Sequence, residues 1–429
     1  MMAGWAFVVA SMVACGPVIP QLPSQGGSPW WEVTSEHVTL WTDASIERGR
    51  KIVRDLELRR QVILTAMGAS SRATAFVIAL RSSREVEAYR GTYFVATAWG
   101  AQNPTGQAGI LLNSSDSDRD HIVSHEMAHV VTGEVFSNQP PWLAEGIATY
   151  FEMVDFNHDD TGVTIGFPRR DRISVLHSGQ VLSAAKLFSC IDSDCRGDTF
   201  YATSWAVFSL LLNEHYDELV RYLRRLNDLR LEGWSRAWYE SLPTLPPDES
   251  ARRLARLRQR YLDELAAIWR DTFPDLPPEK LDIELFKWLR NAQLRLPRIE
   301  IAIRGISITS RALREADVLA ARGFLSWLFS DHDEDARSNV ERALAIERTN
   351  VLARLVQAKF AHTIAPDEAR ATAAAHPGDW RALRLVELAL HDSPDGDEAL
   401  AQLCAMSANT APECAGRRVP REPPATAKP

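Results

Sequence analysis

The feature that most constrains the fold is the pentapeptide His-Glu-Met-Ala-His at residues 125–129. Its two histidines are four residues apart, so on an α-helix they lie on the same face and can bind one metal ion together. Sixteen residues after His129, Glu145 lies in the first turns of a second helical segment that opens with Pro140 and Pro141. The sequence therefore predicts two helices whose side chains converge on one metal site.

Two imidazoles and one carboxylate, from His125, His129 and Glu145, make a three-ligand site for Zn²⁺ that leaves the fourth position open for water. A structural zinc would be closed by a fourth protein ligand, usually cysteine, and no cysteine lies near these residues in the sequence. Such an ion lowers the pKa of bound water, so Glu126 can act as general base and the resulting hydroxide can attack a carbonyl. His121 is expected beside the site or on the surface, because a fourth protein ligand would block the water position.

At these residues the sequence resembles the gluzincin zinc metallopeptidases, and most closely the peptidase MA-like family. The resemblance spans about residues 38–226 and is carried most specifically by residues 125–129 and 141–151. It implies the ligand and base roles just given, and a fold in which a small sheet packs on the active-site helices. It also implies that an edge strand holds an extended peptide substrate. The residues that match this strand are Gly109, Ile110, Leu111, Leu112 and Asn113.

Gluzincins commonly use a downstream tyrosine or histidine to donate a hydrogen bond to the oxyanion of the tetrahedral intermediate. By this resemblance Tyr201 is the candidate, with a packing role as an equal alternative, and Tyr150 and Tyr216 are weaker candidates. The metal-binding histidines also need hydrogen-bond acceptors behind them, and Thr149 and Asp120 are the candidates for that role.

Hydrophobic periodicity predicts a mixture of strands and helices, and the resemblance implies an α+β fold. Strands are expected at residues 37–42, 74–80 and 109–113. Helices are expected at residues 45–67 and 82–89, and a further helix begins near Asp120. From residue 187 onward the pattern is mainly helical, over residues 199–215, 219–226 and 249–271.

The Pro-rich residues 273–278 predict a domain boundary, between a zinc metallopeptidase-like domain at 30–272 and an all-α domain at 279–414. Residues 336–358 faintly resemble a tetratricopeptide helix pair, and a second, similar stretch lies at 376–379. The alternative is an ordinary helical bundle. This domain is expected to offer a surface for a protein partner. The Pro-rich residues 415–429 are expected to be a disordered tail.

The N-terminus carries an apolar run at residues 5–14 that is too short to span a bilayer, with small residues just before Cys15. It resembles a bacterial lipoprotein signal. The resemblance implies a signal peptide at 1–14, lipidation of Cys15, a flexible tether at 15–29 and an exported, membrane-anchored protein at the cell envelope. The alternative is a buried first helix in a cytosolic protein. The net charge of −8 provides no basic excess for binding nucleic acid.

The remaining four cysteines form two local pairs, Cys190 with Cys195 and Cys404 with Cys414. Disulfides form outside the cytoplasm, so two such bonds would agree with export. The alternative is four reduced, buried cysteines.

Together these features predict zinc-dependent hydrolysis of a peptide or protein substrate at the cell envelope. The alternative is a non-catalytic lipoprotein scaffold that retains a metallopeptidase fold and binds a partner through its helical domain. The complete ligand set and the base favour the enzyme, because a scaffold has no use for Glu126.

Overall fold

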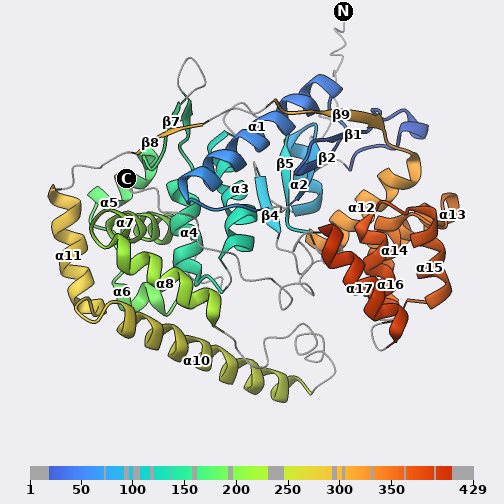
Figure 1. Ribbon diagram of the computed structural model, residues 1–429. Helices are drawn as coiled ribbons and strands as arrows, with labels where there is room; N and C mark the ends of the chain where they lie inside the picture. Colours follow the sequence, from blue (N-terminus) through green and yellow to red (C-terminus); the bar gives the residue numbers. More distant parts are fainter. Residues whose placement is uncertain are drawn as a thin grey trace, which may run out of the picture.

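The computed structural model of the chain is a mixed α/β molecule in which a small sheet lies between two groups of helices (Figure 1). The predicted signal peptide, Cys15 and the tail at 415–429 lie outside the residues that the structure describes. The described residues are 19–71, 74–90, 96–99, 107–115, 120–136, 138–156, 162–191, 197–229, 246–291, 297–301, 305–329, 333–361, 364–390 and 393–407.

The centre of the main sheet is parallel. Strands β2 (Val38–Thr42), β3 (Ala75–Leu80) and β5 (Gly109–Asn113) run in the same direction, with β3 in the middle. All six residues of β3 are buried, as is usual for a parallel strand that is covered on both faces. The predictions of strands at residues 37–42, 74–80 and 109–113 are confirmed, and the mixed sheet with many helices is compatible with the predicted α+β class.

Three further strands, each antiparallel to the neighbour with which it pairs, extend this parallel centre, so that the order across the sheet is β4-β5-β3-β2-β1-β9. Strand β4 (Ala96–Trp99) pairs with β5 on one side. On the other side β1 (Trp31–Thr34) pairs with β2, and β9 (Thr309–Ala312) pairs with β1. The sheet thus joins residues that are 281 positions apart, since Trp31 faces Ala312.

Alternate residues of the central strands face two separate cores, because successive side chains of a strand point to opposite faces. Val77 and Ala79 belong to the larger core, which also contains the apolar face of α1 (Ile46–Ala66). Phe76 belongs to a second core, which α2 (Ser83–Arg90) and α12 (Glu315–Phe329) complete. The sheet is therefore covered on both faces.

Helices between residues 120 and 291 build most of the larger core. They are α3 (Asp120–Val135), α4 (Pro141–Tyr150), α5 (Arg170–His177), α6 (Ala184–Phe188), α7 (Asp198–Glu214), α8 (Tyr216–Asp228), α10 (Pro247–Thr272) and α11 (Pro278–Asn291). Trp142 is buried at the start of α4, with its ring centroid 5.3 Å from Phe188, 6.3 Å from Tyr222 and 6.2 Å from Trp269. This aromatic cluster fixes α4 against α6, α8 and α10. A small second sheet of β6 (Asp155–Phe156), β7 (Gly162–Thr164) and β8 (Arg298–Glu300) completes the region.

The C-terminal helices lie together at the other end of the molecule (Figure 1). They are α12, α13 (Asp333–Ile346), α14 (Val351–Ala361), α15 (Pro366–Ala375), α16 (Trp380–Leu390) and α17 (Pro394–Ser407). Asn350, in the turn between α13 and α14, accepts a hydrogen bond from the backbone N–H of Ala353 and donates one to Asp317 at 2.7 Å. Helices α13 and α14 thus cover the tetratricopeptide-like residues 336–358, and the similar residues 376–379 lie between α15 and α16.

The predicted boundary at residues 273–278 is wrong, because the chain on both sides of it shares the same cores. Leu281 and Leu285 of α11 are buried in the larger core. Strands β8 and β9 complete the two sheets, so residues 279–414 are not all-α. The prolines that suggested a linker lead directly into α11, which begins at Pro278, a position where a proline fits the first turn of a helix.

The prediction of a flexible tether is wrong for residues 19–29. Leu22 is fully buried in the second core, and its carbonyl accepts hydrogen bonds from the N–H groups of Gln25 and Gly27 at 2.8 and 3.0 Å. The apolar side chain of Leu22 anchors a segment whose Gly, Pro and Ser content had suggested a linker. Among the described residues, no helix is long and apolar enough to cross a bilayer.

Candidate metal centre

Helices α3 and α4 supply the three predicted ligands. Helix α3 begins at Asp120 as predicted, and it places His125 and His129 one turn apart on the same face. Helix α4 has Pro141 in its first turn and carries Glu145 toward those histidines. Gly146 lets α4 approach α7 closely, because a Cβ atom at that position would lie 2.6 Å from the backbone oxygen of Ser204. The position of Glu145 is thus set by close contact between helices.

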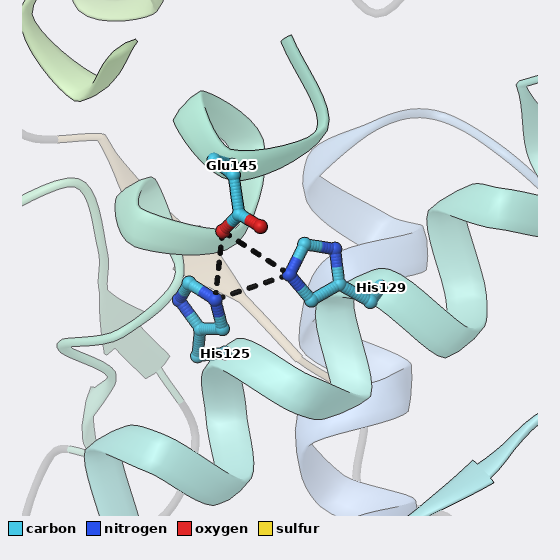
Figure 2. Close-up of side chains that lie close together, drawn as sticks. All are labelled: His125, His129 and Glu145. Carbon is cyan, nitrogen blue, oxygen red and sulfur yellow. Dashed lines mark hydrogen bonds and ion pairs between the residues drawn. The ribbon is translucent and has the colours of Figure 1, made fainter. Parts of the chain in front are cut away.

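The three side chains converge on one point, as Figure 2 shows. The Nε2 atoms of His125 and His129 are 3.1 Å apart. One carboxylate oxygen of Glu145, Oε2, lies 3.1 Å from the Nε2 of His125 and 3.4 Å from that of His129. The side chain of His125 is 12% exposed, against 24% for His129 and 23% for Glu145, so the cluster opens to solvent beside the latter two.

These three side chains could hold a metal ion, and the spacing of their atoms is compatible with zinc. A tetrahedral Zn²⁺ with bonds of about 2.0–2.1 Å has ligand atoms about 3.3 Å apart, which agrees with the observed separations. The Oε2 atom of Glu145 is buried and makes no hydrogen bond within the described part of the chain, despite its two short contacts. Three ligands of this kind also leave a coordination position for water or substrate.

The acceptor behind His125 is Glu152. Its Oε1 atom lies 3.1 Å from the Nδ1 of His125, so Nδ1 donates to the carboxylate when Nε2 faces a metal. The predictions of Thr149 and Asp120 for this role are wrong. The hydroxyl of Thr149 is buried without a hydrogen-bond partner among the described residues, and the carboxylate of Asp120 lies 3.6 Å from Arg59. Glu152 is seven residues after Glu145, a two-turn helical spacing that could have revealed it.

Charge surrounds His125 on two sides. Burial alone would lower the pKa of its imidazole, but the carboxylates of Glu145 and Glu152 outweigh burial and raise that pKa to about 10. Burial would also raise the pKa of Glu145, yet the facing His129 and His125 lower it well below its ordinary value. A proton and a metal ion therefore compete for the same pair of groups.

Glu126, the predicted base, is half-buried beside the ligands, and its charge also helps to raise the pKa of His125. Tyr201 lies in the first turn of α7, and its ring centroid is 6.0 Å from that of His125, so it lies beside one of the candidate ligands. The two weaker tyrosine candidates lie elsewhere. Tyr150 is buried against Phe208 at 5.4 Å, and Tyr216 is 48% exposed at the start of α8.

The buried Arg172 of α5 joins the site to the start of α7, and the sequence did not indicate it. Its guanidinium lies 3.5 Å from the Oε1 of Glu152, donates to Asp198 at 2.6 Å and sits 4.9 Å over the ring of Tyr201. Nothing in the spacing of α5 relates Arg172 to the metal ligands, because their contact depends on how the helices pack.

The prediction that residues 109–113 form an edge strand is wrong. Gly109, Ile110, Leu111, Leu112 and Asn113 form β5, which is fully buried and pairs with β3 on one side and with β4 on the other. Within the described residues, β4 is the outermost strand at this end of the sheet. The four residues of β4, Ala-Thr-Ala-Trp, are too few to give a strong strand pattern.

Cys190 and Cys404 are each disulfide-bonded. Their predicted partners, Cys195 and Cys414, lie outside the described residues, so the pairing itself stays a prediction.

Comparison with known proteins gives one family match. Residues 121–230 match the family described as "Protein of unknown function (DUF1570)". This segment contains the three candidate ligands, and also Glu126, Glu152, Arg172 and Tyr201. No curated protein and no solved structure matches the chain.

Proposed function

We propose that the protein is a zinc-dependent peptidase in which His125, His129 and Glu145 bind one Zn²⁺ and Glu126 is the general base. The observation that carries this proposal is the convergence of two imidazole nitrogens and one carboxylate oxygen, 3.1–3.4 Å apart, from two helices. Two histidines and one glutamate that leave a position open are typical of catalytic zinc, whereas structural zinc is usually closed by a fourth protein ligand.

Each residue has a distinct role in this proposal. A zinc ion at these residues would supply Lewis acidity, which polarises a carbonyl and makes water a better nucleophile near neutral pH. Glu126 takes the proton of the attacking water and returns it to the leaving amine. Tyr201 donates a hydrogen bond to the oxyanion, a role supported by the proximity of its ring to His125.

An extended peptide is the proposed substrate because of the position of β4. An outermost strand can pair with an added backbone segment, and this is a common way to bind a peptide. Helix α3, which carries both histidines, packs beside β4. A peptide that paired with β4 would therefore have its backbone close to the proposed catalytic residues.

We further propose that the protein acts at the bacterial cell envelope, where it is anchored through a lipid on Cys15. The two disulfide-bonded cysteines, Cys190 and Cys404, support export, because the cytosol keeps most thiols reduced.

The experiment that tests the activity compares the parent with Glu126→Gln on a library of peptides. The glutamine keeps the shape of the side chain but cannot accept the proton, so cleavage should fall by about 100-fold or more while the zinc content is unchanged. Equal cleavage by the two proteins would contradict the role of Glu126. If the parent binds zinc and cleaves no peptide, the scaffold interpretation is favoured.

A further inference from the structure

Arg172 is a buried arginine with three partners from two other parts of the chain. It lies in α5 and its side chain is 10% exposed. Its guanidinium contacts Glu152 just after α4, Asp198 at the start of α7 and the ring of Tyr201 in the first turn of α7. An arginine can serve several partners at once because its guanidinium is a rigid, planar fork with five donors.

Glu152 needs a cationic partner. Its side chain is 3% exposed, and burying an unpaired carboxylate is costly. When His125 binds a metal it must be neutral, so it then offers Glu152 a hydrogen bond but no positive charge. Arg172, which is always protonated, is the cation that the structure places on the same oxygen, Oε1, that faces His125.

We propose that Arg172 is a positioning residue of the metal centre, which acts through Glu152 to fix the ring of His125. The contacts run from Asp198 through Arg172 and Glu152 to the Nδ1 of His125, and the other ring nitrogen, Nε2, faces Glu145. Arg172 holds the carboxylate in one orientation, and the carboxylate holds the imidazole with its Nε2 lone pair toward the metal. The inference rests on the proposed zinc site.

The test is a double-mutant cycle read out as the zinc dissociation constant, measured by competition with a coloured chelator. Glu152→Gln should weaken zinc binding by about 10–100-fold, as is usual when the hydrogen-bond partner of a ligating histidine is changed. Arg172→Met should weaken it by about tenfold in the parent, but by less than about twofold in the Glu152→Gln background, because its effect passes through Glu152. Arg172→Lys keeps the charge without the fork and should restore part of the affinity.

Arg170→Ala is the matched control, since Arg170 is an exposed arginine on the same helix, and it should leave the affinity unchanged. An affinity of Arg172→Met equal to that of the parent, or an equal loss with and without the glutamate at 152, would overturn the proposal. If circular dichroism shows that Arg172→Met does not fold, the same cycle with Arg172→Lys decides. A parent protein that binds no zinc would overturn the proposed function as well, whereas a parent that binds zinc tightly with Arg172→Met unchanged overturns this inference alone.

Discussion

Gly146→Ala should loosen the metal site by separating two helices. Gly146 directly follows the proposed ligand Glu145 in α4, at the point where α4 contacts α7. An added Cβ would lie 2.6 Å from the backbone oxygen of Ser204 and 3.0 Å from the Cβ of Phe208. The first distance is 0.8 Å shorter than the 3.4 Å at which ordinary contact begins. Neither neighbour can move away by a side-chain rotation, so α4 itself must shift.

Two opposing effects set the size of the change. Alanine in place of glycine within a helix stabilises it by about 1 kcal/mol. Over-packing costs about 1–3 kcal/mol, and a contact with backbone belongs in the upper part of that range. We therefore expect a net loss of about 1–2 kcal/mol in the free energy of unfolding. Because Glu145 moves with α4, zinc affinity should also fall by about tenfold, since metal sites tolerate displacements of only about 0.5 Å.

Gly133→Ala provides the matched control, because Gly133 lies in α3 and a Cβ there would meet no atom within 4 Å. It should raise the free energy of unfolding by up to about 1 kcal/mol, through helix propensity alone. Urea unfolding measures stability, and chelator competition measures zinc affinity. If the two variants behave alike in both assays, the argument that close packing at Gly146 positions Glu145 is refuted.

Three further predictions concern the pH dependence of zinc binding, the buried Asp43 and the C-terminal part of the chain. Below pH 10, zinc affinity should rise by up to about tenfold for each pH unit. The reason is that the pKa of His125 is raised to about 10, so the ion must displace a proton from this side chain. A zinc dissociation constant that does not change with pH would contradict this prediction. Burial, and then Glu85, raises the pKa of Asp43 from 3.8 to about 7. The folded state therefore holds that proton more tightly, and stability is lost as pH rises from about 4 to about 7. At pH 8, the free energy of unfolding of Asp43→Asn in urea should be about 2 kcal/mol higher than that of the parent. A free energy equal to or lower than that of the parent would contradict the raised pKa of Asp43. A chain that ends at Phe273 lacks β9 and the helices that cover one face of the sheet, so we expect this shortened protein to be insoluble. A soluble product that binds zinc would show that the shared core is dispensable.

The sequence predicted the parts of the fold in which local pattern and burial agree. Strand β3 is an unbroken apolar run and is buried on both faces, and α1 has a regular apolar face. Strand β9 could not be predicted in this way. Its residues, Thr-Ser-Arg-Ala, are mostly exposed, and they are held by pairing with β1 and by an ion pair of Arg311 with Glu32 at 2.7 Å. Such a strand is defined by a distant partner that periodicity does not reveal.

The same distinction applies to the site. His125, His129 and Glu145 were predicted because helix geometry puts the two histidines on one face and a second helix offers a carboxylate sixteen residues later. Glu152 was not predicted from the pattern of α4, because it lies just beyond the end of that helix. Arg172 reaches the site only through the packing of α5 against α7. Contacts that depend on tertiary packing between helices leave no spacing signal in a single sequence.

The measurement that tests the central claim most directly is the zinc content of the purified protein and of His129→Ala, by elemental analysis after dialysis. We expect about one zinc per chain in the parent, and a loss of affinity of at least about 10–100-fold in the variant, because losing a ligand should cost at least as much as losing a partner of a ligand. Circular dichroism of the variant shows whether its fold is retained. A folded His129→Ala protein that keeps the zinc content of the parent would contradict the assignment of the metal centre.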